Sequence, residues 1–182
     1  MAEYIEPADV RGTGMFIIDY KSVADEMWIH LPALKKTRRI ATTEKGKNYM
    51  NSEFSNSDMS SPAQSDFKIR HLEGSGTGEY WIIECIPTDD DKVSEYDFSR
   101  RVSSIDKNNY QIKKIELFDH DNRLFKIIEV ISIQQGGNGK YIISEMKAEN
   151  LTNGRSSVIK FTNISMNTPV EDSVFTFQNL ER

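Results

Sequence analysis

The segment from residue 66 to 166 most constrains the fold of this chain, because short extended stretches alternate there with tight turn signals. Strands are predicted at 66–73, 79–86, 96–105, 110–119, 123–134, 140–149 and 155–166. The connections between them are rich in Gly, Asn and Asp, and pairs such as Asn153-Gly154 supply the positive φ that hairpin turns require. Strands so close in sequence leave no room for crossover helices and must run antiparallel. The sequence therefore predicts a meander sheet and not an α/β fold.

The central predicted strands are apolar on both faces. In 123–134 one face carries Phe125, Ile127 and Ile131, and the other carries Ile128 and Val130. A sheet with one face in water should alternate apolar and polar residues. A large antiparallel sheet of this kind must cover both faces, one by curling on itself and the other by a helix or a ligand. Two alternatives follow: both faces are protein core, or the curled sheet leaves room for an apolar guest.

The first third of the chain is less regular. Residues 1–12 are predicted as an entry loop, and further strands are predicted at 13–20, 26–31 and 37–42, with Pro32 ending the second of them. Ser, Asn and Asp dominate between residues 43 and 65. This composition predicts a loop that crosses an opening, with one helical turn from Asn51 or Ser52 through Met59.

Two shorter stretches complete the prediction. Asp89-Asp90-Asp91 is interpreted as a solvated acidic turn, because its spacing is not that of a calcium-binding loop. Near the C-terminus, Phe175 and Phe177 alternate as residues of a strand do, and they are expected to fix the end of the chain to the sheet.

Composition limits the class of protein. The chain has 182 residues, of which 37% are hydrophobic, and this suits one domain with a real core. Its net charge of -5 argues against a nucleic-acid binder, and Cys85 as the only cysteine excludes an internal disulfide and a multi-cysteine metal site. No apolar run approaches the roughly 20 residues of a membrane-spanning helix, and Met1 to Glu6 lack the pattern of a signal peptide.

An enzymatic function finds little support in the sequence. The chain contains no Gly-x-Ser-x-Gly elbow, no phosphate-binding glycine loop and no His-Glu-x-x-His motif. Its three histidines, His30, His71 and His120, lie in three different segments. Cys85 is expected to be an inert thiol within a strand. We therefore predict no catalytic residue, no metal site and no cofactor.

The stretch from Trp28 to Met59 combines an aromatic residue, an apolar run and a cluster of cations. The cations are Lys35, Lys36, Arg38 and Arg39. They are interpreted either as a solvated strand edge that discourages aggregation or as a surface for anionic head groups or an acidic partner. The sequence leaves these two alternatives open.

Four motifs resemble those of the bacterial outer-membrane lipoprotein-sorting protein family, which belongs with the periplasmic lipoprotein carriers of the LolA/LolB type. The motifs are Pro7-x-x-x-x-Gly12-Thr13-Gly14, Trp28-x-x-Leu31-Pro32-Ala33-Leu34-Lys35-Lys36-x-Arg38-Arg39-Ile40, Ser52-x-Phe54-x-x-x-Asp58 and Phe175-Thr176-x-x-Asn179-Leu180-Glu181-Arg182. The resemblance extends from about residue 4 to the end of the chain. One departure is Asn51, where the family usually has glycine, so the turn there is expected to be less sharp.

The resemblance implies a mainly β fold, an incomplete antiparallel β-barrel formed by a curled meander sheet, with short helical turns as a lid. It also implies a single domain over 1–182 that lacks the N-terminal helix and first strands of the family. The implied location is the periplasm, with the signal peptide removed or outside this chain. An exposed edge left by the missing part is expected to favour self-association. The resemblance does not imply enzymatic activity.

The function implied by the resemblance is that of a periplasmic carrier or chaperone, which binds lipoprotein acyl chains or another lipid during outer-membrane sorting. Trp28, Leu31, Phe54 and Met59 are the candidate lipid-binding residues, with ordinary packing as the alternative for Trp28 and Phe54. Lys35, Lys36, Arg38 and Arg39 would contact head groups or a partner. The alternative function is a structural adaptor that docks to an inner-membrane exporter of the resistance-nodulation-division type and carries no cargo.

Overall fold

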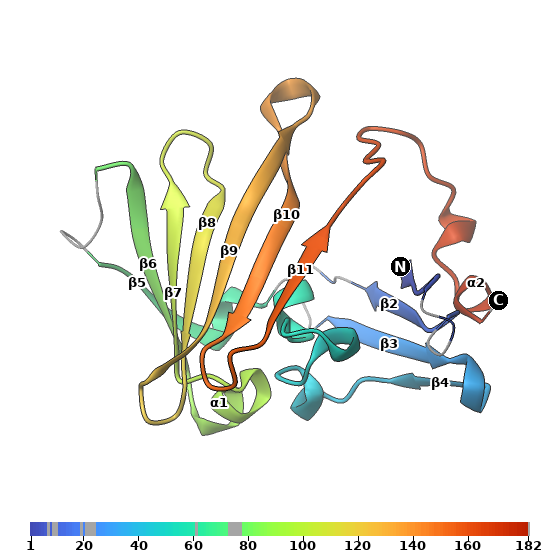
Figure 1. Cartoon of the computed structure of the whole chain (residues 1–182), viewed down its shortest axis with the longest axis horizontal. Coiled ribbons are helices and arrows are strands. Elements are labelled where there is room, and N and C mark those ends of the chain that lie inside the picture. Colours follow the sequence, from blue (N-terminus) through green and yellow to red (C-terminus); the bar gives the residue numbers. More distant parts are fainter. Residues whose placement is uncertain are drawn as a thin grey trace.

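The computed structural model describes residues 1–6, 8, 11–18, 20, 25–60, 62–72 and 78–181, with the side chain of residue 138 excepted. Two antiparallel sheets stand side by side, a seven-stranded one and a four-stranded one (Figure 1). The chain crosses from the small sheet to the large one through a segment of short helical turns, and the C-terminal segment returns to the small sheet. The two termini lie near each other beside the small sheet.

The large sheet is the predicted meander. Its strands lie in the order β11-β10-β9-β8-β7-β6-β5, and every neighbouring pair is antiparallel. Their bounds are β5 (Phe67–His71), β6 (Tyr80–Pro87), β7 (Arg100–Asp106), β8 (Ile112–Phe118), β9 (Leu124–Gln135), β10 (Tyr141–Asn150) and β11 (Ser156–Lys160). The prediction was too long at two places, since β7 begins at Arg100 and β11 ends at Lys160. The end of the first predicted strand at residue 73 and most of the glycine-rich turn after it lie outside the described residues.

The small sheet has the order β1-β2-β3-β4. Its strands are β1 (Ala2–Glu3), β2 (Gly14–Ile18), β3 (Glu26–Leu31) and β4 (Lys36–Arg39). The prediction of a loop over 1–12 missed β1, which pairs with the start of β2. Pro32 ends β3 as predicted and begins the 3-10 helix η1 (Pro32–Leu34), after which Lys35 adopts a left-handed conformation and turns the chain into β4.

Short 3-10 helices fill the segment between the two sheets, residues 40–60 and 62–66 of the described chain, which we call the crossing segment. They are η2 (Thr42–Glu44), η3 (Tyr49–Asn51), η4 (Ser57–Met59) and η5 (Gln64–Asp66), where the sequence predicted one turn over 51–59. Asn51 has φ +59°, a left-handed conformation that asparagine tolerates better than most residues. A further 3-10 helix, η6 (Gly137–Gly139), forms the turn between β9 and β10.

The acidic stretch at 89–91 is exposed, as predicted, but it caps and begins helix α1 (Asp90–Tyr96) and is not a simple turn. The carboxylate of Asp89 accepts a hydrogen bond of 2.9 Å from the backbone N–H of Lys92, and Asp90 and Asp91 lie in the first turn. Negative charge at this end satisfies free N–H groups and complements the helix dipole. The last residue of the helix, Tyr96, is buried and donates a hydrogen bond of 2.7 Å to Asp66.

The C-terminal segment contains helices η7 (Asp172–Val174) and α2 (Phe177–Leu180), so the strand-like alternation of Phe175 and Phe177 does not correspond to a strand. The Phe177 ring packs edge-on against Phe16 and Trp28, with ring centroids 5.5 and 4.9 Å apart. Leu180 is buried against Gly14, since a Cβ added at that glycine would lie 2.6 Å from Leu180. The expected attachment of the C-terminus to a sheet is therefore made by Phe177 and Leu180, whereas Phe175 is half exposed.

The hydrophobic core lies between the two sheets. The small sheet contributes Met15 and Met27, and the crossing segment contributes Ile40, Tyr49 and Phe54. The rest of the core consists of Tyr96 from α1, Phe98 from the connection between α1 and β7, and Leu117, Ile128 and Ala148 from the large sheet. The two sheets do not close on each other, so the fold is mainly β, an incomplete antiparallel barrel with short helical elements, as predicted. In the described part of the chain, no helix has the length and apolar character needed to cross a membrane.

Candidate functional site

An apolar cavity of about 300 Å³ lies on the inner face of the large sheet, opposite the crossing segment. It is lined by Phe54, Ser57, Asp58, Ser60 and Pro62 from the crossing segment and by Arg101, Ile112, Ile115, Ile128, Val130, Ile143 and Met146 from the sheet. A second cavity of about 200 Å³ extends over β5, β6 and β7 and shares Pro62, Arg101 and Ile112 with the first. We call these two adjoining cavities the inner trough. The larger part lies at the lower end of the size range of small-molecule pockets.

The pairing register explains why the trough is apolar. Ile115 lies opposite Ile128, and Val130 lies opposite Met146, so these side chains share one face of three adjacent strands. Toward α1 the same face is filled by the core, where Leu117 is only 2% exposed. Phe54 and Ile128 belong both to the core and to the cavity lining. The trough is therefore the unfilled continuation of the core along the sheet.

The short helical turns that were expected as a lid cover one end of the trough and are held by buried polar contacts. Asp58 in η4 forms an ion pair of 2.7 Å with Lys126 in β9, and both side chains are nearly buried. Lys45 pairs with Glu95 of α1 at 2.5 Å. The backbone N–H of Glu53 donates to Ser157 of β11 at 3.0 Å. These contacts fix the crossing segment to the large sheet and to α1.

The lining of the trough contains two charged residues, Asp58 and Arg101. Asp58 is compensated by Lys126 and also accepts a hydrogen bond of 2.8 Å from the backbone N–H of Ser55. Arg101 donates from Nε to the Ser103 hydroxyl at 3.3 Å, and among the described residues no carboxylate lies within ion-pair distance of it. Burial raises the pKa of the neighbouring Cys85 thiol more than the charge of Arg101 lowers it, so the thiol stays neutral at pH 7 and is a poor nucleophile.

The structure separates the four candidate lipid-binding residues. Phe54 is fully buried at the base of the trough, and Met59 packs against the core in the same segment. Trp28 contacts Phe177 on the side of the small sheet that faces α2, and Leu31 pairs with Lys36 at the end of β3. Of the four, Phe54 lines the trough, whereas Trp28, Leu31 and Met59 do not line it as far as the chain is described. Their part in lipid binding stays a prediction.

Most of the lining comes from residues of the large sheet that were not among the predicted site residues. These are Arg101, Ile112, Ile115, Ile128, Val130, Ile143 and Met146. The signal was present, because the two-faced apolar pattern of strand 123–134 requires something to cover each face. The pattern alone does not tell which face remains open.

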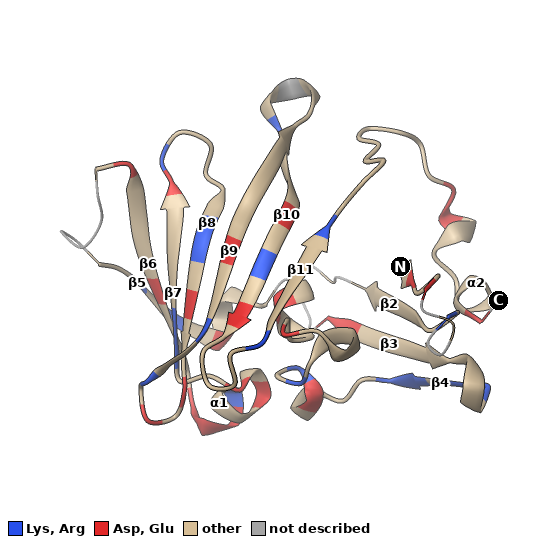
Figure 2. Cartoon of the chain, in the orientation of Figure 1, with Lys and Arg blue, Asp and Glu red and all other residues tan. Residues whose placement is uncertain are grey.

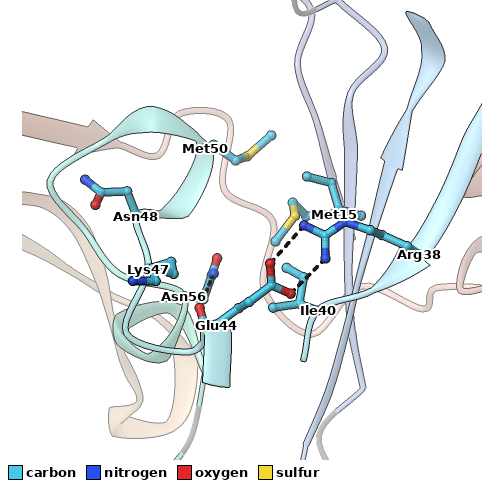
Figure 3. A pocket seen from close by; sticks show the side chains of 9 residues that line it. Met15, Arg38, Ile40, Glu44, Lys47, Asn48, Met50 and Asn56 are labelled. Atoms are coloured by element: carbon cyan, nitrogen blue, oxygen red, sulfur yellow. Dashed lines mark hydrogen bonds and ion pairs between the residues drawn. The ribbon is translucent and has the colours of Figure 1, made fainter. Parts of the chain in front are cut away.

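Three residues of the predicted cationic cluster lie on β4, the edge strand of the small sheet, and Lys35 directly precedes this strand (Figure 2). Arg39 pairs with Glu26 at 3.1 Å, and Arg38 makes two hydrogen bonds of 2.8 and 3.1 Å to Glu44. Lys35 and Lys36 are exposed, with no ion-pair partner in the part of the chain that the structure describes. The Arg38–Glu44 pair spans a small pocket of about 140 Å³ between the sheet and the crossing segment, with Met15 and Ile40 near it (Figure 3). Contact of these four cations with head groups or a partner stays a prediction.

The Arg38–Glu44 pair is expected to make a small, pH-dependent contribution to stability. Hydrogen bonds from Arg38 and from the backbone N–H of Ala41 lower the pKa of Glu44 from its usual 4.5. The stabilisation is therefore complete above pH 4.5 and is lost as pH falls through the lowered pKa. Because both side chains are about one third exposed or more, Glu44→Gln should cost less than about 1 kcal/mol at pH 7. Urea unfolding at pH 7 and pH 3 measures this, and a difference between variant and wild type that persists at pH 3 contradicts it.

A third apolar feature is a groove of about 410 Å³ between β2 and the C-terminal segment, lined by Phe16, Ile17, Ile18, Phe175 and Phe177. It is more open to solvent than the trough. Among the described residues, no group of three or more His, Cys, Asp or Glu side chains is placed to hold a metal ion.

Comparison with known structures defines the class of protein. A domain from Vibrio parahaemolyticus described as an outer membrane lipoprotein-sorting protein shares 27% identity, with a TM-score of 0.87 over 99% of this chain and 76% of that one. A DUF1329 family protein from Desulfovibrio piger shares 25% identity, with a TM-score of 0.82 over 98% and 75% of the two chains. A LolA superfamily protein from Nitrosomonas europaea has the same fold, with 17% identity and a TM-score of 0.70 over 97% and 76%. The fold is therefore LolA-like, as the sequence resemblance predicted.

The chain belongs to a protein family described as "Uncharacterized protein", whose model matches residues 1–182. A comparison with curated proteins finds no significant match.

Proposed function

We propose that this protein is a periplasmic carrier or chaperone that binds an acyl chain of a lipoprotein or another lipid in the inner trough. The observation that supports this most is the unfilled apolar lining between the crossing segment and β7 to β10. The likeness to the lipoprotein-sorting domain of Vibrio parahaemolyticus, which covers nearly the whole chain, supports the same class of function. The open trough also argues against an adaptor whose interior is filled entirely by its own side chains.

The physical basis of carriage is burial of hydrocarbon. Each methylene removed from water contributes about 0.8 kcal/mol, so about six buried methylenes contribute about 5 kcal/mol. This contribution favours retention of the lipid in the trough. It no longer opposes release when an acceptor offers the lipid an equally apolar surface. The proposed step is transfer without a chemical reaction. The exporter contact and the self-association through an exposed edge that the sequence suggested stay predictions.

Filling the trough is expected to abolish most of the binding. Ile112 lines both parts of the trough and is only partly buried, so the indole of Ile112→Trp can occupy the open space without displacing the core. If the indole excludes about two methylenes of the bound lipid from the trough, the affinity for the lipid falls at least tenfold. The measurement is a fluorescence titration of delipidated protein with a fluorescent fatty acid.

Two control variants make this titration decisive. Ile131→Trp adds the same indole to the neighbouring strand β9, but next to Val130 and therefore on the opposite face, where Ile131 is 52% exposed. It should bind as the wild type does. Leu31→Asp tests the site that the sequence suggested on β3, and binding in the trough alone predicts that this variant leaves the affinity unchanged. Loss of binding in Leu31→Asp with normal binding in Ile112→Trp would move the site away from the trough.

A further inference from the structure

Arg101 stands apart from the other charged side chains of the large sheet. It lies on β7 at the junction of the two parts of the trough, and it lines both of them. Its surroundings there are apolar and include Ile83, Ile105 and Ile112. Arg101 is partly buried there, so a ligand that removes its remaining water must supply a compensating partner.

The hydrogen bonds of Arg101 leave most of its guanidinium free in the described part of the chain. Nε donates to the Ser103 hydroxyl at 3.3 Å. By contrast, Arg70 and Arg100, from β5 and β7, both bind the buried carboxylate of Glu84 on the outer face of the sheet. The two terminal nitrogens of Arg101 are thus available for a ligand, and a guanidinium binds carboxylate or phosphate oxygens in pairs.

The balance of charge in the lining favours an anion. Asp58 is the other charged residue of the lining, and Lys126 and the Ser55 backbone already satisfy it. Among the described residues, no carboxylate pairs with the guanidinium of Arg101, which lies beside an apolar surface formed by Ile115 and Val130. This combination matches a molecule that has an oxyanion at one end and a hydrocarbon chain at the other.

We infer that Arg101 binds the oxyanion of an anionic amphiphile, a fatty carboxylate or a lipid phosphate, whose chain extends into the larger part of the trough. This inference rests on the proposed function and specifies its ligand. Arg101 acts as a binding residue that selects anionic over neutral lipids.

The test compares three ligands with the same chain, namely dodecanoate, dodecyl phosphate and dodecanol, each used below its micelle concentration. Their affinities are measured by displacement of a neutral fluorescent dye from delipidated protein. Wild type should bind at least one of the two anions about tenfold or more tightly than the alcohol, since a hydrogen-bonded ion pair distinguishes them. Tighter binding of dodecanoate identifies a fatty acid as the source of the oxyanion, and tighter binding of dodecyl phosphate identifies a phospholipid.

Arg101→Met keeps an unbranched side chain and removes the charge. It should reduce anion affinity about tenfold and change dodecanol affinity less than about threefold. Lys114→Met is the matched control, because Lys114 lies on β8, pairs with Glu116 and does not line the trough in the described structure. This control should keep the wild-type preference, and thermal unfolding checks that both variants are folded.

Each outcome has a defined meaning. Equal binding of all three ligands by wild type and by Arg101→Met overturns the role of Arg101 but leaves the proposed carrier function intact. An equal loss of anion binding in Lys114→Met also overturns it, because the effect would then come from net charge. Failure of wild type to bind any of the three ligands overturns the proposed function itself.

Discussion

Phe54→Ala is expected to lower the free energy of unfolding by about 3–5 kcal/mol. Phe54 is fully buried and lies in the crossing segment, where it belongs to the cluster that joins residues of both sheets. The cavity left by the ring cannot collapse easily, because the backbone on either side is fixed by the hydrogen bonds of Tyr49 to Phe54 and of Glu53 to Ser157. A loss of this size is a large part of the stability of a typical domain.

Urea unfolding followed by tryptophan fluorescence measures this effect, and the two tryptophans report on different sheets. Trp28 lies in β3 of the small sheet and Trp81 in β6 of the large one. Phe175→Ala is the control, because Phe175 is half exposed and its loss should cost within about 0.5 kcal/mol. Equal effects of the two variants would show that the crossing segment does not hold the sheets together.

Asp58→Ala is expected to cost about 3–5 kcal/mol, because it leaves the nearly buried ammonium of Lys126 without a partner. The substitution also removes the acceptor for the backbone N–H of Ser55 at the start of η4. The loss arises from an uncompensated buried charge more than from the attraction of the pair. Differential scanning calorimetry or urea unfolding measures it.

Replacement of both partners separates these two origins. Asp58→Leu combined with Lys126→Met removes both charges and should recover most of the stability that the single variant loses. Asp121→Ala removes the acid of an exposed pair with Arg123 and should change stability by less than about 1 kcal/mol. If Asp58→Ala lowers the free energy of unfolding no more than Asp121→Ala does, the ion pair between Asp58 and Lys126 does not anchor the crossing segment.

The parts of the fold that were predicted correctly are those with a local cause. The seven strands of the large sheet follow from apolar stretches separated by turn residues, and Pro32 ends β3 because it cannot continue the ladder. Helix α1 also has a local signal, since Asp89 caps it, but three consecutive aspartates have the composition of an exposed turn. The left-handed backbone of Met50 has no local signal, whereas asparagine at position 51 tolerates this conformation.

The candidate site was harder to predict because burial depends on distant partners. Trp28 and Phe54 looked equivalent in the sequence, but Trp28 packs against Phe177 from the other end of the chain. Ile131 and Val130 are adjacent and similar, yet one is exposed to solvent and the other faces the trough. Arg101 carries no motif, and its importance comes only from its place between two apolar cavities.

The most direct test of the central claim is a crystal structure of the protein with a fatty acid that carries bromine at the end of its chain. Anomalous diffraction locates the bromine without interpretation of weak chain density. An apolar trough that accepts hydrocarbon predicts a peak beside Ile115, Val130 and Met146. A peak in the open groove at Phe175 and Phe177, with the trough unoccupied, would contradict the account.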